Sequence, residues 1–402
     1  MTTYQAALDF LFPRTTTIKF GLDTTRALLA VLGDPQDRYP TIHVAGTNGK
    51  GSVSTLIAAA LQQAGHRVGL YTSPHLVSFR ERIRVNDVPI SEAAVAAWTE
   101  RLRPTIDAEG ATFFETTTAI AFAHFAAREV DIAVVEVGLG GRLDSTNVIT
   151  PIVSVVTHIA LDHQKYLGET VEAIAREKAG IAKAGVPFVI GESDPVLAEV
   201  LVTAAAGARH VVVPAAEEWL GALGLVGPHQ RRNAAVAEVV LSLLPEPLRP
   251  SGHATAEAFA RARVAGRFDR RGKWLFDVAH NPDSMRALTA TLAESAVPRP
   301  VHALVSILGD KDWSEMLVEL DRAIDVGVLT VAPSADSRKW DLGWLERWLV
   351  DPERPAARAR WRLIPDFGEA MREVQAGAGT VLVTGSFHTV GDVMGELGLE
   401  VA

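Results

Sequence analysis

Residues 43–52 read HVAGTNGKGS, a short apolar strand that runs into a glycine-rich turn and then into a helix. Glycine leaves backbone N–H groups free to point at a ligand, and the N-terminus of a helix favours an anion. The turn adds a lysine for the outer phosphates of a nucleotide and, after one more glycine, a serine hydroxyl. The pattern predicts an ATP site formed by Gly46, Thr47, Asn48, Gly49, Lys50, Gly51 and Ser52.

The sequence around this turn has the order strand, helix, strand. Residues 42–45 suit a buried strand, residues 53–64 suit a helix that Gly65 can end, and residues 67–71 suit the next parallel strand. The alternative is an ordinary glycine turn that carries a surface lysine. The βαβ setting favours the phosphate-binding interpretation.

Composition excludes several classes of protein and site. The 402 residues contain no cysteine, which excludes disulfides, thiolate metal sites and cysteine nucleophiles and is typical of a reducing cytoplasm. No apolar run reaches the ~18 residues of a membrane span, and the first residues lack the pattern of a signal peptide. A net charge of −9 disfavours general binding to nucleic acid, which needs a basic surface. We therefore expect a cytoplasmic protein with neither a membrane nor nucleic acid as a partner.

Apolar stretches that suit buried strands alternate with helical patterns, which is typical of an α/β protein with parallel sheets. Residues 244–252 read LPEPLRPSG, which we interpret as an exposed hinge, and we expect two domains, 1–258 and 259–402. The predicted strands before the hinge are 42–45, 68–71, 132–137, 152–158, 187–190 and 211–213. Those after it are 274–278, 303–307, 328–331, 362–364 and 381–384.

Polar residues follow several strands of the first set. In open parallel sheets ligands bind at the carboxyl ends of strands, so these positions are candidates for a site. Glu136 ends one apolar strand, and a carboxylate buried there is costly unless it is paired or binds a metal. Ser73 and His163 follow two other strands, and we take all three as candidates to hold Mg²⁺. The alternative for Glu136 is a structural ion pair with Arg142.

The segment 170–185, TVEAIAREKAGIAKAG, places Lys178 on an apolar helix stripe with Val171 and Ala175. A lysine is rarely buried without a partner, and desolvation lowers the pKa of its amine and makes the amine more nucleophilic. A lysine that has captured CO₂ presents a carbamate, which can support a metal ion, whereas an ammonium cannot. The alternative is a lysine that reaches solvent or pairs with a carboxylate.

The second set of strands also ends in polar residues. Asp277 and His280 lie in residues 274–284, WLFDVAHNPDS, and Ser386 and His388 follow the last strand. Two polar sheet edges suit a cleft between domains that closes over a nucleotide and a second substrate.

Short motifs occur along nearly the whole chain in the order found in the folylpolyglutamate synthase/dihydrofolate synthase family of the Mur ligase superfamily, which this sequence resembles. The motifs are GTNGKGS, TSPHL, FFETTTAIAF, VEVGLGGRLDSTN, LDHQKYLG, EKAGI, GPHQRRNA, GRFD, DVAHNP, DKD and TGSFHTVGDV. The resemblance implies a P-loop NTPase-like N-terminal domain with a mostly parallel sheet and a smaller Rossmann-like C-terminal α/β domain.

The resemblance also implies an ATP-dependent ligase. The carboxylate of dihydropteroate, or the γ-carboxylate of a folate glutamate tail, would take the γ-phosphoryl group of ATP, and the amine of L-glutamate would then displace phosphate. The implied partners are these small molecules, and we expect a monomer.

Site residues follow from the same motifs. Besides the phosphate loop, the implied nucleotide contacts are Asn233, Arg267, Asp277 and His280. The implied Mg²⁺ residues are Ser73, Glu136 and His163, and Lys178 matches a carbamylated lysine. The residues expected at the reaction centre are Lys50, Lys178, Asp277, His280 and Ser386. Candidates for the pterin or folate pocket are Arg80, Arg82, Phe114 and Thr116.

Two departures from the family pattern bear on substrate contacts. Val278 stands where the family often has glycine, and residues 385–390, GSFHTV, differ from the more usual aromatic-containing version of the family's last motif. A Mur-type ligase for another carboxylate would share the domains and the mechanism, but few residues precede the phosphate strand. A non-catalytic nucleotide switch would need few of the polar residues named above.

Overall fold

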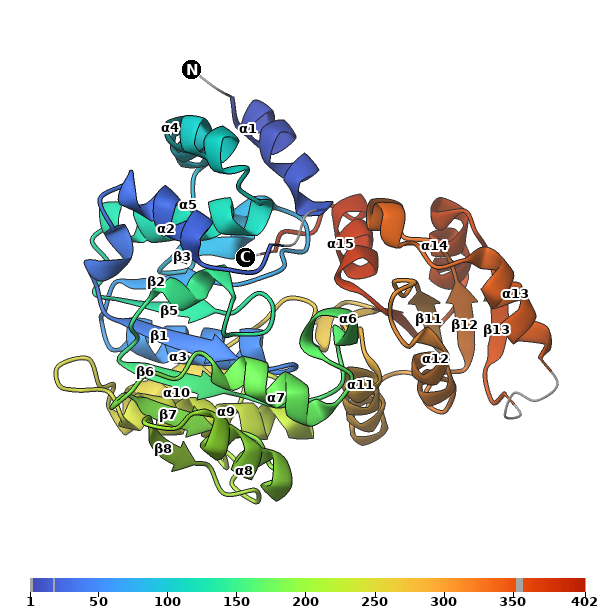
Figure 1. The fold of residues 1–402 in the computed structure, drawn as a ribbon. Helices are drawn as coiled ribbons and strands as arrows, with labels where there is room; N and C mark the ends of the chain where they lie inside the picture. The colour runs from blue at the N-terminus through green and yellow to red at the C-terminus, as the bar shows by residue number, and fades with distance from the viewer. Residues whose placement is uncertain (1–2, 17–18, 352–356, 402) are drawn as a thin grey trace.

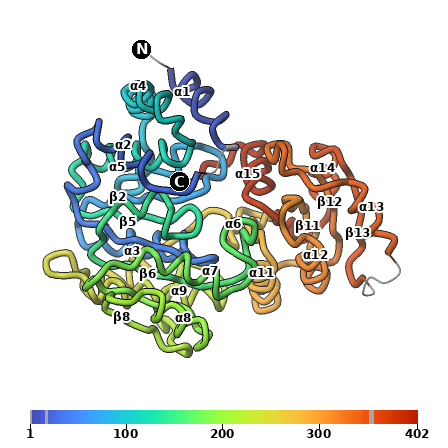
Figure 2. Tube along the Cα trace, in the orientation of Figure 1, coloured from blue at the N-terminus to red at the C-terminus, as the bar shows by residue number. Residues whose placement is uncertain are grey.

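The computed structural model describes residues 3–16, 19–351 and 357–401. The chain forms two α/β bodies that lie side by side, the N-terminal one in blue to yellow and the C-terminal one in orange to red (Figure 1). An eight-stranded sheet forms the first body and a six-stranded sheet forms the second. Figure 2 traces the chain from one body into the other.

The larger sheet is mostly parallel, with the strand order β4-β3-β2-β5-β1-β6-β7-β8. The strands from β2 to β8 in that order run parallel, and β3 and β4 pair antiparallel at the edge. Both faces of β1, β2, β5 and β6 are buried, which explains their continuous apolar runs. The strands are β1 (Thr41–Ala45), β2 (Val68–Tyr71), β3 (Ile83–Val85), β4 (Val88–Pro89), β5 (Ile132–Glu136), β6 (Val153–Val156), β7 (Pro187–Ile190) and β8 (Arg209–Val212).

Helices cover both faces of this sheet. One face carries α3 (Lys50–Gln63), α9 (Pro228–Ser242) and α10 (Gly252–Arg261). The other carries α1 (Tyr4–Leu11), α2 (Asp23–Ala30), α4 (Glu92–Glu109) and α5 (Phe113–Ala127). Near β6 and β7 the cover is α7 (Val171–Ala179) with α8 (Pro195–Ala204), and the short α6 (Gln164–Leu167) lies close to the second body.

The smaller sheet has the order β13-β12-β11-β14-β10-β9, and every pair is parallel except β10 with β9. Its strands are β9 (Asp269–Arg271), β10 (Trp274–Phe276), β11 (Val301–Val305), β12 (Val326–Leu329), β13 (Arg360–Leu363) and β14 (Thr380–Thr384). One face packs on α11 (Pro282–Glu294), α12 (Trp313–Asp321) and α13 (Leu342–Val350), and the other on α14 (Phe367–Ala376) and α15 (Phe387–Glu396).

The predicted α/β class with two largely parallel sheets is confirmed. Every predicted strand is present, and its ends shift by at most two residues. The sequence analysis missed β3, β4 and β9. These strands are short and antiparallel, so they do not produce the long apolar runs by which buried parallel strands are recognised.

The predicted hinge at residues 244–252 is wrong. This segment joins α9 to α10 inside the N-terminal body, where Leu244 is fully buried. The predicted division after residue 258 falls within α10, and Phe259 and Ala262 still belong to the N-terminal core. The chain passes to the second body between α10, which ends at Arg261, and β9, which begins at Asp269. Prolines produce a tight turn between two helices as readily as a linker between domains, which explains the error.

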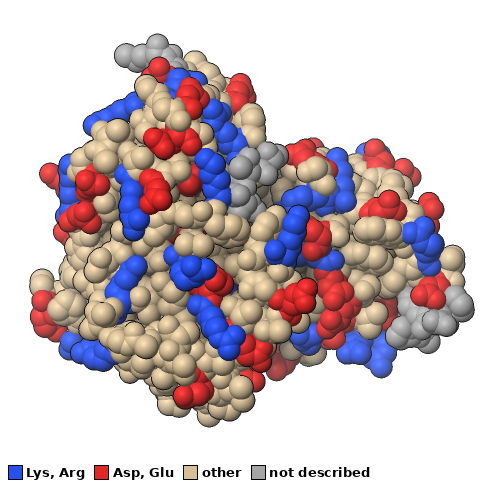
Figure 3. Space-filling view, in the orientation of Figure 1, with Lys and Arg blue, Asp and Glu red and all other residues tan. Residues whose placement is uncertain are grey.

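On the face shown in Figure 3, the described Lys and Arg side chains are interspersed with Asp and Glu rather than gathered into one area. Among the described residues, no helix has both the length and the apolar character needed to cross a bilayer.

The packing of α10 generates a stability prediction. Phe259 is fully buried, and its ring meets the edge of Trp219 at a centroid distance of 5.0 Å. We expect Phe259→Ala to lower the free energy of unfolding of the N-terminal body by about 3–5 kcal/mol, because it leaves a cavity. Urea unfolding followed by Trp fluorescence measures this.

The matched control is Leu220→Ala, because the Leu220 side chain is 90 % exposed. This control should stay within about 0.5 kcal/mol of the parent chain. Equal losses in the two variants would contradict the assignment of α10 to the N-terminal core.

Candidate active site

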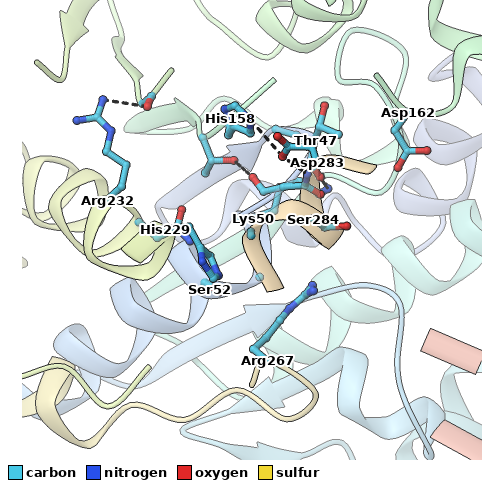
Figure 4. Close-up of a pocket in the computed structure, with 18 of the residues that line it drawn as sticks. Thr47, Lys50, Ser52, His158, Asp162, His229, Arg232, Arg267, Asp283 and Ser284 are labelled. Atoms are coloured by element: carbon cyan, nitrogen blue, oxygen red, sulfur yellow. Dashed lines mark hydrogen bonds and ion pairs between the residues drawn. The ribbon is translucent and has the colours of Figure 1, made fainter. Parts of the chain in front are cut away.

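A cavity of about 540 Å³ lies between the two bodies, at the carboxyl ends of the central strands of the larger sheet. Its N-terminal side is formed by the phosphate loop, residues 46–52, and by groups that follow β2, β5 and β6. Its C-terminal side is formed by Arg267, Asp277, His280, Phe387 and the first turns of α11. Figure 4 labels Arg267, Asp283 and Ser284 from this side. The predicted meeting of two polar sheet edges is thus present.

The phosphate loop follows a path that only glycine allows. At Gly46 (φ 148°) an added Cβ would lie 1.9 Å from Thr157 Oγ1, and at Gly49 (φ 89°) it would lie 2.6 Å from Asn233 Oδ1. The loop is fixed further by Thr47 N, which donates to the His158 carbonyl at 2.6 Å. The first residue of α3 is Lys50, whose Nζ donates to the Gly46 carbonyl at 3.1 Å. The structure therefore gives the loop the predicted position at the start of a helix.

The predicted Mg²⁺ residues Ser73, Glu136 and His163 all line the cavity. Glu136 is 4 % exposed, and burial raises the pKa of its carboxyl. Its Oε2 accepts a hydrogen bond from Ser73 N at 3.2 Å. The alternative ion pair is absent, because Arg142 pairs with Glu177 at 2.9 Å.

His163 offers a nitrogen ligand, because burial lowers the pKa of its imidazole to about 3 and keeps the ring neutral. Within the described part of the chain, no three His, Asp or Glu side chains form a group that could hold a metal ion by itself. Mg²⁺ does not require such a group, because it keeps waters and substrate phosphates alongside one or two protein ligands. The donors present therefore suit a cation that is bound together with a nucleotide.

Lys178 is buried, as its helix stripe predicts, and it lines the cavity. Its Nζ donates to the Gly46 carbonyl at 2.8 Å, so the side chain neither reaches solvent nor takes a carboxylate as the partner of this bond. Burial, reinforced by the charge of Lys50, lowers the pKa of the Lys178 amine to about 7. A substantial fraction of the amine is therefore neutral near pH 7, which is the form that can react with CO₂.

The C-terminal side contributes Asp277, Arg267 and His280. Burial raises the pKa of the Asp277 carboxyl to about 6, although Arg267 opposes the rise. That carboxyl accepts hydrogen bonds from Phe268 N at 2.9 Å and from Ala279 N at 3.0 Å. The guanidinium of Arg267 lies over the Phe387 ring, 5.2 Å from its centroid. Asn233, the remaining predicted nucleotide contact, also lines the cavity.

Ser386 does not line this cavity. It is 1 % exposed, it caps α15, and its hydroxyl donates to the Ser306 carbonyl at 3.0 Å. Its place at the reaction centre stays a prediction.

The four predicted pterin or folate residues lie outside the cavity lining. Arg82 Nε donates to His75 Nδ1 at 2.7 Å, and its guanidinium lies 5.1 Å from the centre of the Phe113 ring. Arg80 Nε donates to the Ile90 carbonyl at 2.6 Å. Phe114 packs against Gly138, whereas Thr116 is fully buried and its hydroxyl donates to the Thr112 carbonyl. This packing leaves the Thr116 side chain no open face toward a ligand.

Contacts between the bodies were missed by the sequence analysis. Asn48 of the phosphate loop donates to Asp283 Oδ2 at 2.8 Å, and Asn281 Nδ2 donates to Asn48 Oδ1 at 3.1 Å and to Asp162 Oδ2 at 3.2 Å. Lys311 pairs with Asp162, and both side chains are nearly buried. Burial opposes ionisation of Asp162, but His280 and Lys311 hold the pKa of its carboxyl below the ordinary range. Asp162 and Lys311 belong to quoted motifs, but no signal in the sequence pairs them.

His158 belongs to the same network (Figure 4). Its Nδ1 lies 3.0 Å from Glu192 Oε2, and its Nε2 lies 3.3 Å from Asp283 Oδ2. Burial alone would lower the pKa of this imidazole, but its hydrogen bonds with the two carboxylates raise the pKa to about 10. A charged imidazole from the segment after β6 of one body therefore contacts α11 of the other.

Known proteins resemble both halves of the chain. Residues 44–220 match the Mur ligase middle domain, and residues 261–387 match the Mur ligase, glutamate ligase domain. The folylpolyglutamate synthase of Lacticaseibacillus casei is 37 % identical over 380 residues, which covers 84 % of this chain and 88 % of that protein. The dihydrofolate synthase/folylpolyglutamate synthase of Bacillus subtilis is 32 % identical over an alignment of 436 positions, which covers 98 % of this chain and 98 % of that protein.

Solved structures are similar over the same length. The structure of E. coli FolC in complex with DHPP and ADP is 30 % identical, covers 98 % of each chain and has a TM-score of 0.86. The bifunctional folylpolyglutamate synthase/dihydrofolate synthase of Yersinia pestis, complexed with AMPPNP and Mn ion, is 32 % identical, covers 99 % of each chain and has a TM-score of 0.84.

The position of His158 generates a pH prediction. Its pKa is about 10 in the folded chain and ~6.5 in an unfolded one, so its contribution to stability is complete below pH ~6.5 and is lost as the pH rises toward 10. We expect His158→Gln to lower the melting temperature most at pH 6 and least at pH 10, so that the two curves converge. Thermal unfolding across this range measures the difference.

The control is His253→Gln, since the His253 side chain is 84 % exposed. Its melting curve should run parallel to that of the parent chain over the whole range. A constant difference between His158→Gln and the parent would contradict the charged state of His158.

Proposed function

This chain belongs to the folylpolyglutamate synthase/dihydrofolate synthase family of Mur ligases, and on that premise we propose how its residues add L-glutamate to their acceptor. The chain is an ATP-dependent ligase that adds L-glutamate to dihydropteroate, to the γ-carboxylate of a folate, or to both. The main support for this function is the cavity that the phosphate loop, Glu136 and Lys178 line together with Asp277 and His280 of the other body.

The first step is phosphoryl transfer from ATP to the acceptor carboxylate. Backbone N–H groups of residues 46–52 and the ammonium of Lys50 would bind the phosphates and stabilise the charge that develops on them. The family uses ATP with a divalent metal, and here Ser73, Glu136 and His163 would hold the cation, which supplies further charge neutralisation. The acyl phosphate product is reactive toward water, so the meeting of the two bodies would protect it.

The second step is attack by the amine of L-glutamate, which must first lose a proton from its ammonium form. Asp277, whose pKa is raised by burial to about 6, would accept that proton near neutral pH. The C–N bond then forms at the acyl carbon, and the bond to the phosphate oxygen breaks. Arg267, beside Asp277, would help to hold the departing phosphate by its charge.

For Lys178 we propose a carbamate. The nearly neutral pKa of the buried amine favours reaction with CO₂, and the resulting carboxylate would lie at the edge of the metal site. A negative group there would orient the cation and its waters.

We expect Lys178→Ala to lower ligase turnover about 10–100-fold while the fold is retained, because a metal-supporting carboxylate is lost. Lys183→Ala, which removes a partly buried lysine from the same segment, serves as the control and should stay within about twofold of the parent. In ¹³C NMR with labelled bicarbonate, a carbamate signal should be present in the parent and absent from Lys178→Ala. Near-parental turnover of Lys178→Ala would remove the carbamate from the mechanism.

The choice of acceptor is tested by mass spectrometry of the products. The pure chain is incubated with ATP, Mg²⁺ and L-glutamate and with either dihydropteroate or a reduced monoglutamyl folate. A gain of one glutamate on both acceptors identifies a bifunctional enzyme, and a gain on only one assigns the specificity. A correctly folded chain that modifies neither acceptor would contradict the folate assignment and favour a Mur-type ligase for another carboxylate.

The monomeric state and the cytoplasmic location remain predictions. Light scattering on the purified chain tests the first, and its expected result is a particle of 43.1 kDa.

A further inference from the structure

An acidic side chain lies at the entrance of the phosphate loop. Asp283, in the first turn of α11, accepts a hydrogen bond from Asn48 Nδ2 at 2.8 Å and so joins the C-terminal body to the loop. Asp283 also lines the cavity. A carboxylate at this point repels the phosphates that the loop is built to bind, so its charge requires compensation.

His158 supplies a positive charge at the right place. Among the described residues, it is the cation that the structure pairs with Asp283, at 3.3 Å. Arg286 acts on Asp283 from the same helix, but its guanidinium pairs with Glu315 at 2.7 Å. Arg232, from α9, donates to the Gly191 and Val213 carbonyls.

His158 is held in this orientation by Glu192, whose side chain is 1 % exposed. Glu192 Oε2 lies 3.0 Å from His158 Nδ1 and accepts a hydrogen bond from Ile159 N at 2.7 Å. The other oxygen, Oε1, accepts a hydrogen bond from Asp194 N at 2.9 Å. Because these contacts occupy both carboxylate oxygens, the Glu192 side chain is held in place and cannot turn toward a ligand in the cavity. The imidazole of His158 is therefore fixed on one side and presents its other nitrogen to Asp283.

We propose that His158 is a positioning residue for the nucleotide: oriented by Glu192, it balances the charge of Asp283, so that an acidic residue can dock α11 on the phosphate loop without repelling the phosphates. The positive charge of His158 and the negative charge of Asp283 then act on the nucleotide with opposite signs. This inference deepens the proposed function, since it rests on the nucleotide role of residues 46–52.

The test is Mg–ADP binding by isothermal titration calorimetry, measured on the full chain and on three variants. His158→Gln should weaken ADP binding about tenfold, because the carboxylate is left uncompensated. Asp283→Asn keeps the oxygen that accepts from Asn48 and should tighten binding about threefold. The double variant should bind within about threefold of the parent and better than His158→Gln. In turnover assays, the same changes should appear in the KM for ATP, with kcat altered less than about threefold.

If the contact between His158 and Asp283 only holds the structure together, substitution of either residue would weaken ADP binding. Weaker binding by Asp283→Asn, or a double variant no better than His158→Gln, would overturn the proposal. If His158→Gln does not fold, Asp283→Asn alone tests the proposal, because tighter ADP binding supports it and weaker ADP binding contradicts it. His253→Gln controls for the loss of an exposed histidine.

ADP binding needs no acceptor, which separates the two proposals. If the ADP series behaves as expected and no glutamate is added to either acceptor, the folate assignment fails and the role of His158 stands. If the parent chain does not bind ADP, the role of His158 fails.

Discussion

The close passage of the backbone through Gly46 and Gly49 is the constraint on which the site depends. Thr157 and Asn233 occupy the space that any Cβ at these positions would need. Because no side chain fits, the loop can turn tightly out of β1 and begin α3 at Lys50, which directs its amides into the cavity. The parallel sheet supplies the other groups, since the carboxyl ends of β5 and β6 meet at the same edge.

Several ionisable side chains are buried around this loop, at a cost to the stability of the folded chain. Glu136 and Asp277 have carboxyls whose pKa values are raised by burial, and Lys178 has an amine whose pKa is lowered by it. Burying such groups costs stability, and mutual pairing offsets only part of the cost. Perturbed groups gathered in one cavity are typical of a site that receives charged ligands. The structure therefore places its electrostatic cost where phosphates and a cation would reduce it.

The sequence predicts the central parallel strands well because they are buried on both faces and leave continuous apolar runs. The same topology brings Ser73, Glu136 and His163 to one edge, so their gathering is predictable without long-range information. The helix stripe likewise identifies Lys178 as buried. Local patterns thus define each half of the site.

Contacts between the two halves of the site could not be predicted from the sequence. Asn48 and Asp283 are separated by 235 positions, and no periodicity encodes their meeting. The prolines of residues 244–252 predict a break in regular structure but do not say whether a domain or only a helix ends there. The orientation of one body on the other depends on side-chain contacts that only the folded chain reveals.

The hydrogen bonds from Asn48 to Asn281 and Asp283 have a thermodynamic consequence. One asparagine belongs both to the nucleotide loop and to the joint between the bodies, so any change in the angle between the bodies would be linked to occupancy of the loop. Linkage is reciprocal: any acceptor that changes the angle must alter nucleotide affinity by the same factor by which the nucleotide alters acceptor affinity. Cooperativity between the two substrates would then need no separate regulatory site.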